Sequence, residues 1–188
     1  MRVFFMFMAW FPVVALAGEV PQVEVKEGGE AGRCEMSLNI GWFARQDVSI
    51  KPGRILGPDF NLHIEDNVIY GFIRGKSTRF KVGPEEISGS AAEFDLMLHV
   101  KKSDFETEIR GLVGTQRVVA RVSDEKVSVS SVASALSVSK VKGGYFRGHV
   151  GSGPDIQLAE MTVSGCDLTF LRDRPGLIVA LFMVWLGS

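Results

Sequence analysis

The feature that most constrains this chain is a period-two alternation of apolar and polar residues. Successive side chains of a strand point to opposite faces, so this period is typical of half-buried antiparallel strands. The apolar positions of two such stretches are Phe94, Leu96, Leu98 and Val100, then Phe105, Thr107 and Ile109. The chain is therefore predicted to be all-β, an antiparallel β-barrel or β-sandwich of roughly eight to ten strands.

Proline and glycine divide the chain into strand-length pieces. Five of the six prolines beyond position 17 adjoin a glycine, and such pairs mark turns. The pairs are Pro52-Gly53, Gly57-Pro58, Gly83-Pro84, Gly153-Pro154 and Pro175-Gly176. We expect a single β domain over residues 34–175.

The alternation changes phase near Ser130-Ser131. Val127 and Val129 lie at odd positions, whereas Leu136 and Val138 lie at even positions. One extra residue exchanges the two faces of a strand, so a bulge or a tight turn is expected here.

The N-terminal segment has the pattern of a signal peptide. Met1-Arg2 is weakly positive, residues 3–17 are uncharged and mostly apolar, and Ala15 and Ala17 are small residues at the −3 and −1 positions. Such segments are removed on export, so residues 1–17 are expected to be cleaved off. A polar leader, residues 18–33 with a short strand at Gln22–Lys26, would follow. The expected location is extracytoplasmic, either periplasmic or secreted.

The chain contains two cysteines, Cys34 and Cys166, near the two ends of the expected domain. Exported proteins reach oxidising compartments in which disulfides persist. A disulfide between Cys34 and Cys166 is therefore predicted, and it would tie the first strand to the last. Two separate buried thiols are the alternative.

The C-terminal segment, residues 176–188, contains an unbroken apolar run from Leu177 to Leu186. One interpretation is a buried strand or a short core helix. The other is membrane association through Leu177–Leu186, as an anchor or as part of an anchor signal. A helix of ten residues covers only about 15 Å of a hydrocarbon core of about 30 Å, so a complete span is not expected.

Few residues point to catalysis or to a bound cofactor. His63, His99 and His149 are not at metal-ligand spacing, so no metal site, cofactor site or catalytic residue is predicted. His63 and Glu65 share a strand face and could form a weak metal or proton-handling site, although a solvated face is the preferred interpretation. The formal net charge of −1, from 21 basic and 22 acidic residues, gives no electrostatic footprint for nucleic acid.

These observations favour an exported, non-enzymatic binding or structural β protein. Its partner would be a protein, a lipid or an envelope polymer of unknown identity. Two alternatives stay open. The first is a carrier of a lipid or other hydrophobic ligand in the cell envelope, and the second is a membrane-anchored surface protein.

Overall fold

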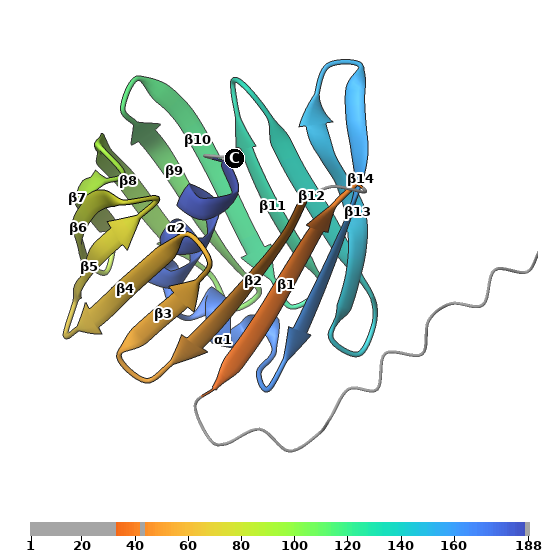
Figure 1. Cartoon of the computed structure of the whole chain (residues 1–188), viewed down its shortest axis with the longest axis horizontal. Helices are drawn as coiled ribbons and strands as arrows, with labels where there is room; N and C mark the ends of the chain where they lie inside the picture. The colour runs from red at the N-terminus through yellow and green to blue at the C-terminus, as the bar shows by residue number, and fades with distance from the viewer. Residues whose placement is uncertain (1–32, 42–43, 187–188) are drawn as a thin grey trace, which may run out of the picture.

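The computed structural model of the chain describes residues 33–41 and 44–186, which form a closed antiparallel barrel (Figure 1). Each strand pairs with the next along the chain, and β14 pairs with β1 to close the barrel. The fourteen strands are β1 (Cys34–Ile40), β2 (Ala44–Lys51), β3 (Arg54–Gly57), β4 (Phe60–Glu65), β5 (Val68–Ile73), β6 (Lys76–Val82), β7 (Glu86–Ala91), β8 (Phe94–Lys102), β9 (Glu106–Val113), β10 (Gln116–Ser123), β11 (Lys126–Ser131), β12 (Ala135–Lys142), β13 (Tyr145–Ser152) and β14 (Asp155–Ser164).

The predicted all-β class is confirmed, and of the two architectures the structure is the barrel. The expected number of strands, roughly eight to ten, is too low, because the described residues alone form fourteen. Several hairpins turn on two residues without proline, at Asp66-Asn67, Arg74-Gly75 and Ala92-Glu93. Asp66, Arg74, Ala92 and Glu93 have positive φ there, as the twist of a tight hairpin requires. No proline–glycine pair marks these three turns.

The inward positions of the strands form the core. Leu96, Leu98 and Val100 point into the barrel as the alternation predicts, with at most 6% of their surface exposed. Phe94 and Phe105 depart from that pattern and are 52% and 80% exposed. Phe94 is the first residue of β8 and Phe105 lies in the β8–β9 turn, so both are beyond the packed layer.

The phase change near Ser130-Ser131 is a turn. β11 ends at Ser131, β12 begins at Ala135, and the Ser131 N–H donates to the Ser134 carbonyl at 2.8 Å. The side chains on either side of the turn return to the barrel interior on neighbouring strands.

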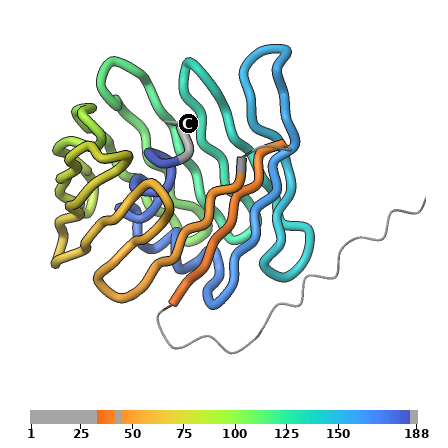
Figure 2. The backbone as a smooth tube through the Cα atoms, in the orientation of Figure 1, coloured from red at the N-terminus to blue at the C-terminus, as the bar shows by residue number. Residues whose placement is uncertain are grey.

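Two helices follow the last strand. Helix α1 (Leu168–Arg172) lies across one end of the barrel, and α2 (Pro175–Leu186) runs inside the ring of strands (Figure 2). Every residue from Leu177 to Val184 is at most 7% exposed. A helix that is apolar on all sides must be enclosed, and here the barrel encloses it. Membrane association through Leu177–Leu186 would require α2 to leave the barrel.

A disulfide joins the start of the barrel to the segment before α1. Cys34 and Cys166 are bonded, with their Cα atoms 5.1 Å apart. The bond holds the entry of α1 against β1, where the barrel closes. The expected signal peptide, residues 1–17, and the strand expected at Gln22–Lys26 lie outside the described residues.

Candidate binding site

A pocket of about 600 Å³ opens at the end of the barrel where α2 enters. Its walls come from the β2–β3, β4–β5 and β6–β7 turns on one side and from the corner between α1 and α2 on the other. The lining residues are Ile50, Lys51, Pro52, Gly53, Ile64, Asp66, Asn67, Ile69, Val82, Gly83, Pro84, Lys102, Phe170, Asp173, Arg174, Pro175, Gly176 and Leu177. This volume lies within the usual range of small-molecule sites.

The floor of the pocket is apolar. Ile69 and Leu177 are buried there, whereas Ile64 and Val82 are half-buried and face the opening. A Cβ on Gly176 would lie 2.6 Å from a methyl carbon of Val82. Glycine therefore lets the first turn of α2 approach β6 closely, and this approach closes the back of the pocket.

The rim of the pocket is charged. Lys51, Lys102 and Arg174 supply three cations, and Asp66 and Asp173 supply two carboxylates. The Lys102 ammonium donates to the Asp173 backbone carbonyl at 3.0 Å, which leaves two of its three N–H groups for another acceptor. The rim can therefore bind an anionic group next to an apolar floor.

The α1–α2 corner is fixed on the side away from the pocket. Arg172, 15% exposed in its side chain, donates to the Asp124 carboxylate at 3.0 Å, and the Thr107 hydroxyl donates to the Arg172 carbonyl at 2.8 Å. The Arg174 guanidinium lies 4.1 Å from the ring centroid of Phe170 and donates to its carbonyl. The contacts of Arg172 hold the corner against β9 and the β10–β11 turn, whereas Phe170 and Arg174 line the pocket on the side facing β2 to β7.

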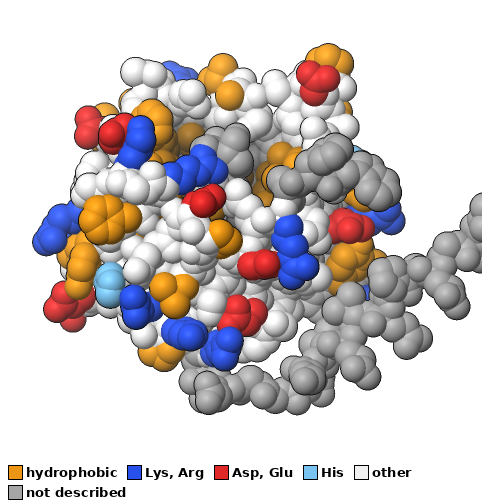
Figure 3. Space-filling view, in the orientation of Figure 1, with side chains coloured by type: hydrophobic (Ala, Val, Ile, Leu, Met, Phe, Trp, Pro, Cys, Tyr) orange, Lys and Arg blue, Asp and Glu red, His pale blue; other side chains and the backbone are white. Residues whose placement is uncertain are grey.

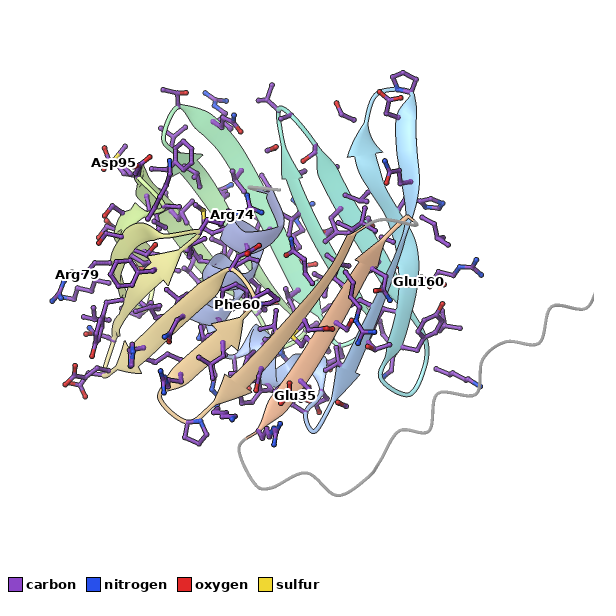
Figure 4. The ribbon with its side chains drawn as sticks, viewed as in Figure 1. Glu35, Phe60, Arg74, Arg79, Asp95 and Glu160 are labelled. Atoms are coloured by element: carbon purple, nitrogen blue, oxygen red, sulfur yellow. A yellow bond between two sulfur atoms is a disulfide. The ribbon has the colours of Figure 1, made fainter. Side chains whose placement is uncertain are left out.

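A second, smaller cavity of about 360 Å³ lies at the opposite end, beside the last turns of α2. Phe182 and Met183 form part of its wall, and Arg74 and Lys76 lie at its edge. Arg74 donates to the Val184 carbonyl at 3.3 Å, so its charge already complements the C-terminal end of α2 (Figure 4). This cavity is smaller, and both of its cations are engaged, Arg74 by the helix and Lys76 by the Glu93 carboxylate.

The histidines considered in the sequence lie apart on the outer surface. His63 and Glu65 share the outward face of β4, as expected, and the His63 ring stacks on Tyr70 with centroids 5.4 Å apart. His99 and His149 occupy outward positions on β8 and β13. In the described part of the chain, no three His, Cys, Asp or Glu side chains are placed to hold a metal ion.

The pocket could not be identified from the sequence because its residues come from separate turns. One signal was present. Pro52-Gly53, Gly83-Pro84 and Pro175-Gly176, three of the five proline–glycine pairs, all line this pocket. In an up-and-down barrel, every second turn lies at the same end. A correct list of the strands in chain order would therefore have placed the turns at Pro52-Gly53 and Gly83-Pro84 at one end.

No protein-family model matches the chain, and no curated protein or solved structure is similar to it. Among the described residues, no helix has the length and apolar character needed to cross a membrane. The disulfide is typical of an oxidising compartment. Functional inference therefore depends on the geometry of the chain itself.

Proposed function

We propose that this protein is an exported, non-enzymatic binding protein for a small amphipathic molecule with an anionic head. The observation that carries the proposal is the pocket of about 600 Å³ with an apolar floor and three cations at its rim. The apolar part of the ligand would contact Ile64, Val82 and Leu177. The anionic head would lie at the rim.

The charges at the rim favour an acidic head over a basic one. Lys51, Lys102 and Arg174 outnumber Asp66 and Asp173. The Asp173 carboxylate also lies 3.5 Å from the Arg172 guanidinium and is partly neutralised by it. A ligand carboxylate or phosphate would therefore gain charge-assisted hydrogen bonds, which are stronger than neutral ones.

The proposed site for a hydrophobic ligand is at the end of the barrel and not in its interior. A carrier of this shape would ordinarily use the barrel interior, but here Leu177–Val184 occupy that interior. The site is instead the end of the barrel, with α2 as part of the wall. Export is supported by the N-terminal sequence pattern and by the Cys34–Cys166 disulfide.

Dodecanoate is a suitable first probe because it joins a medium-length alkyl chain to a carboxylate. Isothermal titration calorimetry, below the micellar concentration, should give a Kd between about 1 μM and 1 mM for a ligand of this size. Dodecanol tests the head group. We expect it to bind at least about tenfold more weakly, because it lacks the charge.

A blocking variant tests the location. Ile64→Trp places a larger side chain in the mouth of the pocket, and it should weaken dodecanoate binding at least about tenfold. Val141→Trp is the matched control, since Val141 is 57% exposed on β12 and does not line the pocket. Unchanged binding in Ile64→Trp, or equal binding of dodecanol, would overturn the proposal.

A further inference from the structure

A second surface, independent of the pocket, lies on the outer face of β3 to β6. Arg54 faces His63 across the β3–β4 pair, and His63 faces Tyr70 across the β4–β5 pair. Tyr70 in turn faces Arg79 across the β5–β6 pair. All four side chains point outward, and we call them the arginine row: Arg54, His63, Tyr70 and Arg79.

Strand spacing sets the dimensions of the arginine row. Neighbouring strands lie about 4.8 Å apart, so the two arginines at its ends are separated by about 14 Å. Between them the His63 and Tyr70 rings stack nearly parallel, with 17° between their planes. Over the face of the barrel that Figure 3 shows, basic, acidic and apolar side chains are intermixed.

The two arginines lack acidic partners within residues 33–41 and 44–186. Arg54 donates only to the Asn61 amide oxygen, at 3.4 Å, and Arg79 points away from the barrel (Figure 4). Glu65, on the outer face of β4, accepts from the Tyr70 hydroxyl at 3.3 Å. Most other exposed arginines of the described barrel do have such partners, for example Arg45, which lies 2.9 Å from its acidic neighbour.

One exposed aromatic ring adjoins the arginine row. Phe72 is 58% exposed on β5, next to Asn61 on β4. Together with residues of the β3–β4 and β5–β6 turns, these two residues line a shallow hollow of about 560 Å³. A flat apolar ring beside an amide and two guanidinium groups offers stacking, neutral hydrogen bonds and ionic hydrogen bonds on one surface.

We propose that this surface binds an anionic polysaccharide, with a sugar ring on Phe72 and acidic groups of the chain on Arg54 and Arg79. Guanidinium groups match carboxylate and sulfate oxygens through paired donors. The apolar C–H face of a sugar ring packs on an aromatic ring, and the Asn61 amide can bond sugar hydroxyls. The span of about 14 Å between the arginines suits several sugar units of an extended chain.

A polysaccharide fits this surface better than a nucleic acid does. Proteins that bind single strands present successive free aromatic faces along a positively charged groove. Here the facing sides of the His63 and Tyr70 rings are occupied by each other, which leaves Phe72 as the free platform.

The test uses the full mature chain and a galacturonate hexamer, with a neutral glucose hexamer of equal length as the control ligand. The Arg54→Ala/Arg79→Ala variant should bind the galacturonate hexamer at least about tenfold more weakly than the unmodified chain. It should also reduce the dependence of affinity on salt. Phe72→Ala should weaken binding about threefold to tenfold and leave the salt dependence unchanged.

Arg110→Ala/Arg147→Ala is the matched control, since it removes the same charge from exposed positions on β9 and β13. Affinity within about twofold of the unmodified chain is expected there. Equal losses in the two double variants would overturn the proposal, because net charge alone would then explain binding. Tighter binding of single-stranded DNA, lost in Arg54→Ala/Arg79→Ala, would assign the surface to nucleic acid instead.

Discussion

The enclosed helix makes a prediction that can be worked out in magnitude. Phe182 lies on α2 and is fully buried in the barrel. Truncating a buried phenylalanine to alanine costs about 3–5 kcal/mol in lost transfer free energy and cavity formation. For a domain of this size each kcal/mol lowers the Tm by about 2–4 °C, so Phe182→Ala should melt about 6–20 °C lower. The loss is a large part of a typical total stability of about 5–15 kcal/mol.

The assay is urea and thermal unfolding followed by far-ultraviolet circular dichroism, with the disulfide intact. Leu181→Ala should also cost about 2–5 kcal/mol, because neighbouring residues of a helix point about 100° apart and both are buried. Ile156→Ala is the control, since Ile156 is 64% exposed, and it should change stability by less than about 0.5 kcal/mol. If Phe182→Ala behaved like Ile156→Ala, α2 would not be part of the core.

Two further predictions concern the covalent and ionic contacts of the barrel. Replacing Cys34 and Cys166 by serine should lower the free energy of unfolding by about 2–5 kcal/mol, measured from the urea midpoint, because the bond closes most of the chain; an unchanged midpoint would contradict this. The hydrogen bond from Arg121, at 2.7 Å, lowers the pKa of Glu108. A carboxyl with a lowered pKa stabilises the fold at pH values above the usual glutamate pKa of about 4.3. This stabilisation is lost as the pH falls through the folded-state pKa. As the pH falls below about 5, the free energy of unfolding of Glu108→Gln should therefore decrease less than that of the unmodified chain. Identical decreases in the two proteins would refute the assignment.

Much of the fold could be predicted from the sequence because the alternation follows directly from strand geometry. Leu96 and Leu98 point inward as expected, and the two cysteines are close enough to bond. The number of strands could not be predicted. Ala92-Glu93 carries no turn signal, yet both residues adopt positive φ in a two-residue hairpin. Tertiary pairing of β7 with β8 imposes that conformation against local preference.

The place of the C-terminal segment could not be derived from its own residues. A run of uniformly apolar residues such as Leu177–Leu186 is compatible with a core strand, a core helix or a membrane-associated segment. The width of a barrel grows with its number of strands. The fourteen described strands enclose α2, so the place of the helix follows from the strand number. A short core helix was one interpretation of the segment, but the strands that enclose it could not be named from the sequence.

The two candidate sites were missed for a related reason. The arginine row exists only because of strand register, since Arg54 and Arg79 are 25 positions apart in the chain. A shift of one residue in any of the three pairings would move at least one of the four side chains to the interior. His63 was noted as part of a solvated face, but its partner Tyr70 could be named only from the register of β4 with β5.

The most direct test of the functional account is a methyl NMR titration of the protein with dodecanoate. We predict shifts that saturate together and are confined to Ile64, Ile69, Val82 and Leu177, the pocket at the end of the barrel where α2 enters. Saturable shifts centred on Met183, at the other end of α2, would place the ligand in the smaller cavity and contradict the account. The absence of any saturable shift would contradict it as well.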